Sequence, residues 1–297
     1  NNLEEQGLIK SRTFFKYYCD FAGLGQKIQA GDYLIKKSMD VFEIADLLTT
    51  GDGNPITTDI TIIPGTTVEV IAESLKEKGI FDDTSEFLNI CKTGEGVTDY
   101  YFIDEELKTE NVESRRYLLE GYLAPNTYEI YTDASALDII KKLLSQTDKV
   151  FTAEWQARAE EIGMTMDQVL TLASMIEKET DGTDQAHIAS VIYNRLQKPG
   201  ETAGLLQIDA SLLYGLPDHT GAITNADKAV DTPYNLYLHK GLPPTAIANP
   251  GSAALKAAMD PNDTDYYYYA LGTDGKHHFS KTLSEHNAFV GSSSYGG

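Results

Sequence analysis

Residues 166–180, MDQVLTLASMIEKET, have the pattern of an amphipathic helix that carries a carboxylate on its apolar side. At about 100° per residue the apolar side chains fill one continuous arc; they are Met166, Val169, Leu170, Leu172, Ala173 and Ile176. Glu177 falls inside this arc, whereas Glu179 lies at its edge. The predicted polar face carries Asp167, Thr171, Ser174 and Lys178. The two glutamates are therefore expected to have different surroundings.

A carboxylate held against apolar side chains loses part of the hydration of its charged form. Such a carboxyl group keeps its proton to higher pH, as a general acid near neutral pH must. The helical pattern therefore makes Glu177 a candidate acid. Two structural explanations stay open: the side chain reaches solvent at the helix end, or it is buried and paired with an arginine such as Arg195.

The composition predicts a globular protein that does not bind nucleic acid. A chain of 297 residues with 41% hydrophobic residues is long enough and apolar enough to build a sizeable core. The net charge is −21. An acidic chain without a basic stripe cannot replace the counterions around a polyanion. Nucleic-acid partners are therefore excluded.

The cysteines and the apolar segments bear on the redox state of the chain and on whether it crosses a membrane. Cys19 and Cys91 match no metal-ligand spacing, so they form either one disulfide or two free thiols. No apolar run approaches the roughly 20 residues that span a bilayer, and the chain has no signal-peptide pattern. The chain begins abruptly with NNLEEQGLIKS, which is compatible with the loss of a preceding segment. We expect a soluble part of a longer protein.

The first third contains a weak internal repeat. VFEIADLLTTG from Val41 aligns with VEVIAESLKEKG from Val68, and both stretches predict short amphipathic helices. An extended segment precedes each helix, and Ser38 and Thr67 are the expected N-caps. The repeat is compatible with two ordinary βα units or with a dedicated binding module.

The remaining pattern predicts an α+β protein of two parts. Residues 107–116 are charged and lack periodicity, so we expect an N-terminal region at 1–112 and a mixed α+β catalytic domain at 113–297. In the second part, helices are expected mainly within 133–163 and over 166–180, 184–197 and 283–290. Residues 265–280 predict a hairpin that turns at 273–275.

Polar and aromatic residues form clusters downstream of the helix at 166–180. Gln207 and Asp209 would share a face on an extended segment. Tyr234 and Asn235 precede a rigid Gly-Leu-Pro-Pro turn. Tyrosines and amides in a groove suit a sugar polymer, because sugar rings stack on aromatics and hydroxyls need hydrogen bonds. The six histidines lack metal-ligand spacing, and no phosphate-binding loop or nucleophile elbow is present.

Six sequence blocks together resemble one family. LLEGYLAPNTY, LASMIEKET, VIYNRL, LQIDASLLYG, YNLYLHKGLPPTAIANPG and HHFSKTLSEHN have the order and spacing of the YceG-like, or MltG-type, endolytic murein transglycosylases. The resemblance covers nearly the whole chain. The repeat region likewise resembles the LysM-like part that precedes the catalytic domain in this family. Ala124 and Asn126 stand where the family usually has Phe and Asp.

The resemblance implies a bacterial cell-wall enzyme on the extracytoplasmic face of the membrane. The family is anchored by an N-terminal transmembrane helix, which this sequence does not contain. Its substrate is the glycan strand of peptidoglycan, cell-wall synthases are candidate partners, and no cofactor or metal is expected. The first glutamate of the family's EKET block is the catalytic residue, and it corresponds to Glu177.

The expected reaction uses one carboxylate twice. Glu177 would protonate the bond between N-acetylmuramic acid and N-acetylglucosamine and then accept the proton of the muramyl C6 hydroxyl, which closes a 1,6-anhydro ring. Candidate substrate-binding residues are Glu120, Tyr122, Gln207, Asp209, Tyr234 and Asn235. One alternative is a muramidase-like hydrolase with Asp209 or Glu120 as the second carboxylate. Another is a non-catalytic peptidoglycan-binding scaffold for cell-wall synthases.

Overall fold

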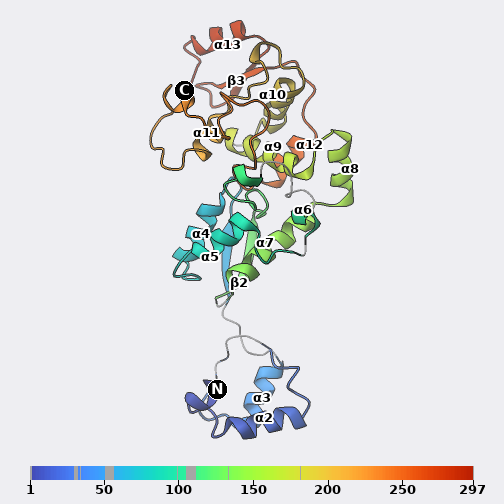
Figure 1. Ribbon diagram of the computed structural model, residues 1–297, viewed down its shortest axis with the longest axis vertical. Coiled ribbons are helices and arrows are strands. Elements are labelled where there is room, and N and C mark those ends of the chain that lie inside the picture. The colour runs from blue at the N-terminus through green and yellow to red at the C-terminus, as the bar shows by residue number, and fades with distance from the viewer. Residues whose placement is uncertain are drawn as a thin grey trace. The chain divides into compact units, whose positions relative to one another are not determined.

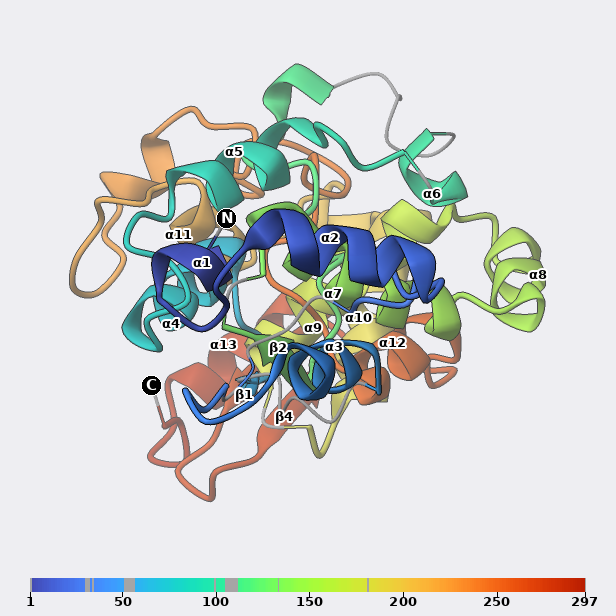
Figure 2. The same ribbon diagram turned by 90° about the horizontal axis from the view of Figure 1, so that it is seen from below.

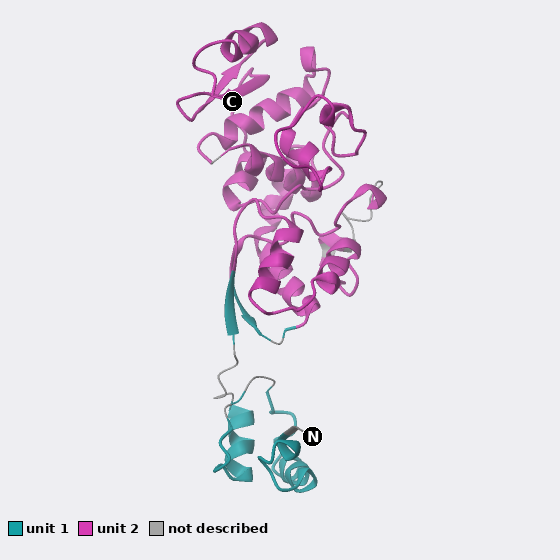
Figure 3. Ribbon diagram, turned by 90° about the vertical axis from the view of Figure 1, so that its left-hand side faces the viewer, with its two compact units in different colours: residues 1–60, 128–134 teal, residues 61–127, 135–297 magenta. Residues whose placement is uncertain are grey.

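The computed structural model describes residues 2–29, 33, 35–50, 57–98, 100–104, 112–132, 134–180 and 182–296. The chain forms two compact units (Figure 3). Unit 1 contains residues 1–60 and 128–134, and unit 2 contains residues 61–127 and 135–297. This division by contacts falls at a different place from the expected boundary at residue 112. That boundary separates functions rather than compact units, and it stays a prediction.

Unit 1 contains three helices (blue in Figure 2), namely α1 (Asn2–Glu5), α2 (Arg12–Phe21) and α3 (Val41–Thr50). Its buried core consists of Ile9, Phe15, Cys19, Ile44 and Ala45. The Asp40 carboxylate caps α3, because it accepts 2.8 Å hydrogen bonds from the N–H groups of Phe42 and Glu43. The predicted cap at Ser38 is therefore wrong. The extended segment expected before α3 falls partly on residues 30–32 and 34, which lie outside the described residues.

The second copy of the repeat forms a strand followed by a helix, as predicted. β1 (Thr57–Ile62) pairs with β2 (Asn126–Tyr131), and α4 (Val68–Glu77) follows β1. Ile60 and Ile62 are buried and alternate with exposed residues along β1. The Thr67 hydroxyl accepts a hydrogen bond from the Val70 N–H at 3.4 Å and caps α4 as expected. The following elements are α5 (Ser85–Thr93), α6 (Tyr101–Asp104), the 3₁₀ turn η1 (Val112–Ser114) and α7 (Ala136–Val150).

Helix α9 (Met166–Glu179) lies at the centre of the C-terminal half of unit 2 (Figure 1). Thr165 and Gln168 form a capping box that fixes its first turn. Four helices pack against it: α8 (Ala153–Glu161), α10 (Gln185–Gln197), α11 (Asp209–Tyr214) and α12 (Ser252–Met259). The 3₁₀ turns η2 (Gly200–Thr202) and η3 (Asp227–Ala229) lie in the connecting loops. The helices predicted at 166–180 and 184–197 are confirmed.

Burial of α9 is not one-sided. The expected polar face is covered as well, since Asp167, Thr171 and Ser174 are all buried. Ser174 donates to the Thr171 carbonyl at 2.7 Å and accepts from the Ile247 N–H at 3.0 Å. Of the predicted polar face, Lys178 is exposed, whereas neighbouring segments supply the hydrogen bonds that the buried Asp167 and Ser174 need.

The chain ends in a hairpin and a short helix. β3 (Tyr268–Leu271) and β4 (His277–Ser280) are antiparallel, with Tyr269 opposite Phe279, and α13 (Leu283–Val290) packs on both strands. The predicted hairpin and final helix are confirmed. Cys19 and Cys91 are buried free thiols. The architecture is mixed α+β, as predicted, and within the described ranges no helix is long and apolar enough to cross a bilayer.

Gly121 provides a test of the packing between the loop at 117–125 and the segment at 246–249. Gly121 has φ +89°, and a Cβ there would lie 2.4 Å from the Ala246 Cβ. We expect Gly121→Ala to combine left-handed strain of about 1–2 kcal/mol with an overpacking cost of about 1–3 kcal/mol. The control is Gly79→Ala, because Gly79 has φ +72° but no other heavy atom within 4 Å of the place that a Cβ would take. Chemical denaturation should show the larger loss for Gly121→Ala, and equal losses would contradict the packing described.

Candidate active site

The last turn of α9 carries the carboxyl group with the most unusual environment, Glu179. Its Oε2 accepts a 2.6 Å hydrogen bond from the Tyr269 hydroxyl of β3. Burial raises the pKa of Glu179, and the nearby Asp209 carboxylate acts in the same direction, whereas Tyr269, His277 and Arg195 oppose the rise. A carboxyl group in such surroundings is suited to donate a proton.

Two cavities meet at Glu179. The first, called here the Gln207 cavity, has a volume of about 360 Å³ and is lined by Glu179, Gln207, Asp209, Tyr237, His286 and Asn287 among others. The second, the His277 cavity, measures about 340 Å³ and is lined by Lys178, Glu179, Thr180, Asp184, Leu271 and His277 among others. Glu179 is common to both linings, so a chain-like ligand could place one unit on each side of its carboxyl group.

The structure brings Gln207 and Asp209 together in one cavity wall, though not on an extended strand. Gln207 has φ +56°, a conformation rare for a residue other than glycine, and Asp209 begins α11. Asp209 accepts a 2.5 Å hydrogen bond from the Tyr237 hydroxyl, and Lys228 lies 3.9 Å from the same oxygen. The cavity therefore combines carboxylates, an amide and aromatic rings.

Glu177 lies against a loop rather than within the apolar core. Its Oε2 accepts a 3.0 Å hydrogen bond from the Gly251 N–H, and its Cγ lies 3.7 Å from where a Cβ of Gly65 would be. Glu177 and Glu179 are both partly buried. The apolar arc of α9 is buried as predicted, and Lys178 at the end of the polar face is exposed. Catalysis by Glu177 stays a prediction.

Glu120 is completely buried and serves as a junction of hydrogen bonds. Its carboxylate accepts from the Val68 N–H at 3.1 Å, the Tyr214 hydroxyl at 3.0 Å and the Asn249 amide at 3.3 Å. Val68 is the first residue of α4, so Glu120 connects the strand–helix unit to the loop that contains Asn249. Burial raises the pKa of Glu120 to about 8.

Three further candidates are also interior residues. Tyr122 donates to Asp167 at 2.9 Å and stacks on Phe102. The Tyr234 hydroxyl accepts from the Arg116 N–H at 3.0 Å. Asn235 donates to two backbone carbonyls of the loop before it, at 3.1 and 2.7 Å. All three side chains make structural contacts inside the protein. Their contact with substrate stays a prediction.

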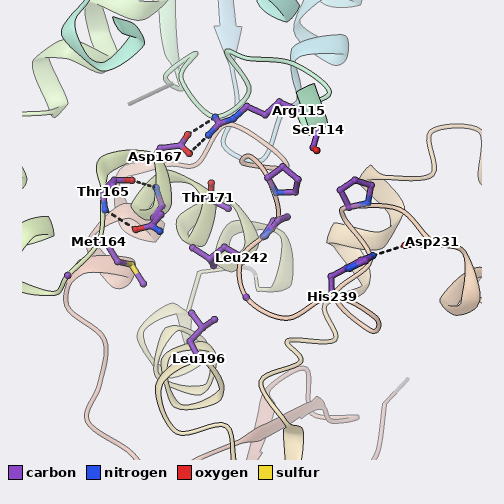
Figure 4. Close-up of a pocket in the computed structure, with 16 residues that line it drawn as sticks. Ser114, Arg115, Met164, Thr165, Asp167, Thr171, Leu196, Asp231, His239 and Leu242 are labelled. Atoms are coloured by element: carbon purple, nitrogen blue, oxygen red, sulfur yellow. Dashed lines mark hydrogen bonds and ion pairs between the residues drawn. The ribbon is translucent and has the colours of Figure 1, made fainter. Parts of the chain in front are cut away.

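The largest cavity lies at the opposite end of α9 (Figure 4). This Pro243 cavity has a volume of about 880 Å³ and is lined by Arg115, Asp167, Leu196, His239, Leu242 and Pro243 among others. Its carboxylates are already paired, Asp167 with Arg115 at 2.5 Å and Asp231 with His239 at 2.7 Å. Asp167 and Glu179 are separated by roughly 18 Å along the helix. We therefore place the candidate active site at the last turn of α9, which carries Glu177 and Glu179, rather than in this cavity.

The sequence did not single out Tyr269, Asp184 or His277. Tyr269 and His277 lie on neighbouring strands within a stretch rich in tyrosine and histidine, and strand alternation could have placed them on one face. Asp184 precedes α10 and was expected only as a helix start. Among the residues that the structure describes, no group of three His, Cys, Asp or Glu side chains could hold a metal ion.

The family follows from comparison with known proteins. The model of the YceG-like family matches residues 1–292. The chain belongs to the YceG-like family. The resemblance of the sequence blocks is therefore confirmed, and the EKET block with Glu177 and Glu179 is part of a YceG-like chain.

Named relatives and a solved structure agree with this membership. The chain is 33% identical to an endolytic murein transglycosylase of Bacillus subtilis over 295 residues, which is 96% of this chain and 78% of the relative. It is 29% identical to an endolytic murein transglycosylase of Streptococcus pneumoniae, covering 97% of this chain but 54% of that relative. A crystal structure of a YceG-like protein from Listeria monocytogenes matches with a TM-score of 0.68 and 32% identity, over 97% of this chain and 93% of that one.

The buried Glu120 predicts a pH-dependent stability. Its pKa in the folded protein is about 8, against an ordinary value of 4.5. Between these values the folded state keeps the proton and the unfolded state has lost it, so stability falls as the pH rises through this window. Thermal melting from about pH 5 to about pH 8.5 should show this decline, and Glu120→Gln should reduce it. Identical pH dependence in the parent and the variant would contradict the assignment.

Proposed function

We propose that this chain is an endolytic lytic transglycosylase of peptidoglycan whose proton donor is Glu177. The observation that carries the proposal is the match of the chain to the YceG-like family over residues 1–292, with Glu177 as the first glutamate of the EKET block. Glu177 lies on the last turn of α9, where its Oε2 accepts a hydrogen bond from the Gly251 N–H, and Glu179 on the same turn lines two cavities. The names of the relatives from Bacillus subtilis and Streptococcus pneumoniae supply the substrate class.

The proposed reaction needs only one carboxyl group. Protonated Glu177 donates to the oxygen between N-acetylmuramic acid and N-acetylglucosamine, and the bond from the muramyl C1 to that oxygen breaks. The muramyl C6 hydroxyl attacks C1, and the Glu177 carboxylate accepts its proton. The product is a 1,6-anhydromuramyl end. The nucleophile is tethered to the reacting sugar, so no second carboxylate is needed to activate water.

A muramidase-like hydrolase is the alternative that the cavity itself favours. Asp209 shares the Gln207 cavity with Glu179, and a hydrolase requires a second carboxylate. Asp209 already accepts a hydrogen bond from the Tyr237 hydroxyl and lies close to Lys228, so its carboxyl group is engaged in contacts within the cavity wall. Glu120, the other candidate, is enclosed by protein hydrogen bonds. We therefore favour the transglycosylase.

The cellular setting is proposed from the sequence resemblance. The chain would act outside the cytoplasmic membrane, carried by an N-terminal membrane anchor, and would work beside cell-wall synthases. The LysM-like region would help to bind glycan, and the strand–helix unit of β1 and α4 supports that role. If the chain binds purified sacculi but releases no fragments, the non-catalytic scaffold is the correct alternative.

Paired variants of the two glutamates test the proposal. We expect Glu177→Gln to lower fragment release from purified sacculi by at least about 100-fold, because general acid catalysis is lost. Glu179→Gln is the matched variant, two residues later on the same helix, and should retain more activity. Mass spectrometry of the parent digest should show anhydromuramyl ends, whereas reducing ends would indicate hydrolysis. Loss of activity in Glu179→Gln with activity retained in Glu177→Gln would move the catalytic role to Glu179.

A further inference from the structure

Helix α2 of unit 1 exposes an aromatic face. Phe14, Tyr17 and Phe21 are 56%, 71% and 95% exposed. At about 100° per residue, these three side chains fall within about 60° of arc around the helix. The buried residues of α2, Phe15 and Cys19, lie on its other side. A surface helix ordinarily turns polar side chains away from the core, so packing within unit 1 does not account for these exposed rings.

The aromatic face continues onto helix α3. The Tyr18 ring packs edge-to-face on Phe42, with centroids 4.8 Å apart, and 54% of Phe42 is exposed. Tyr18 itself is half-buried at the margin of the core. The five side chains Phe14, Tyr17, Tyr18, Phe21 and Phe42 are called here the aromatic patch. Exposed apolar side chains that occur singly are ordinary, whereas a cluster of them marks an interaction surface.

Basic side chains lie beside the aromatic patch. Lys10, Arg12 and Lys16 are exposed, and Asp20 is the one acidic residue of α2. Residues 1–50 hold six of the 24 lysines and arginines of the chain and seven of its 45 aspartates and glutamates. This region is therefore almost neutral in a chain whose net charge is −21. An anionic surface would repel the acidic remainder of the chain and attract the basic side chains beside the patch.

The chemistry of the aromatic patch favours a lipid bilayer over a sugar chain as its partner. Phe14, Phe21 and Phe42 have no group that hydrogen-bonds to sugar hydroxyls, whereas the Gln207 cavity is lined by amides and carboxylates. Aromatic rings on one face of a helix, with lysine and arginine beside them, are typical of helices that lie in a bilayer interface. Long basic side chains reach the headgroups while the rings enter the boundary of the acyl chains.

We propose that the aromatic patch of unit 1 binds the surface of an anionic lipid bilayer, with its exposed rings between the headgroups and the acyl chains and with Lys10, Arg12 and Lys16 at the lipid phosphates. Binding of this kind is reversible, and its strength depends on the apolar area that enters the bilayer and on the charge of the lipids. The inference is independent of the catalytic role proposed for Glu177, because the two cavities at the end of α9 are lined by residues of unit 2.

Sedimentation of the full chain with lipid vesicles tests the proposal. The vesicles contain phosphatidylcholine and phosphatidylglycerol in equal amounts, or phosphatidylcholine alone. We expect binding to the anionic vesicles, weaker binding to the neutral ones, and a decrease when salt is added, because salt screens the basic side chains. Tyr17→Ser/Phe21→Ser removes the two most exposed rings of the patch and should lower the partition coefficient for anionic vesicles by at least about tenfold.

The matched control removes two exposed apolar side chains from unit 2. Val70→Ser/Leu238→Ser should bind anionic vesicles as the parent does, because both positions lie outside the patch. All four substituted side chains are exposed, so circular dichroism and thermal melting should show folded proteins in both cases. The proposal is wrong if the parent does not bind anionic vesicles, if Tyr17→Ser/Phe21→Ser binds them as well as the parent, or if the control loses as much binding.

A fluorescent side chain in the patch reports directly on contact with lipid. Trp155 is the single tryptophan of the chain, so Trp155→Phe/Phe21→Trp places the only indole in the patch. Its emission should shift to the blue with anionic vesicles and should be quenched by lipids that carry a quencher on the acyl chain; an unchanged spectrum of the bound protein would contradict the proposal.

Two further measurements distinguish the other possible occupants of the patch. Sedimentation velocity of the parent and of Tyr17→Ser/Phe21→Ser detects contact between copies of the chain, and pelleting with purified sacculi detects contact with glycan. If the substitutions abolish self-association or sacculus binding and leave vesicle binding at the parent level, the patch serves a second copy or a sugar chain, and the assignment to lipid is wrong.

Discussion

The hydrogen bond from Tyr269 to Glu179 joins the two parts of the fold on which the site depends. Glu179 is the last residue of the central helix, and Tyr269 belongs to the C-terminal hairpin. Residues of the hairpin line both cavities beside Glu179, so the carboxyl group is enclosed only when helix and hairpin are together. Enclosure raises the pKa of Glu179, and the same contacts supply the groups that limit the rise. The packing of the hairpin on α9 and the pKa of Glu179 therefore depend on the same hydrogen bond.

A second junction fixes the strand–helix unit of β1 and α4 to the helical part of unit 2. Asn249 exchanges backbone hydrogen bonds with residues 65 and 66, and its amide reaches both Thr66 and Glu120. Glu120 in turn binds the first N–H of α4. Buried polar networks of this kind define one arrangement because each group needs its partner. Glu177 takes part in this junction through the Gly251 N–H, so the loop that the junction fixes also positions the Glu177 carboxyl group.

The sequence predicted the regular elements well because they depend on local pattern. The central helix, its capping residues, α10 and the hairpin all follow from periodicity and turn residues. The helical arc alone did not reveal how Glu177 and Glu179 are surrounded, for a physical reason. A helical arc identifies the buried face fully only when the opposite face meets water, and Thr171 and Ser174 on that opposite face of α9 are buried. Glu120, Tyr122, Tyr234 and Asn235 stand in family blocks, but their partners come from distant segments that no local pattern reveals.

The direct test of the central claim is a crystal structure of Glu177→Gln with a glycan tetrasaccharide of alternating N-acetylglucosamine and N-acetylmuramic acid. The account predicts that the sugar chain binds at the last turn of α9, beside the Gln207 and His277 cavities, with the scissile oxygen within about 3 Å of the residue 177 side chain. A glycan bound in the Pro243 cavity, or a scissile oxygen closer to Glu179 than to residue 177, would contradict it.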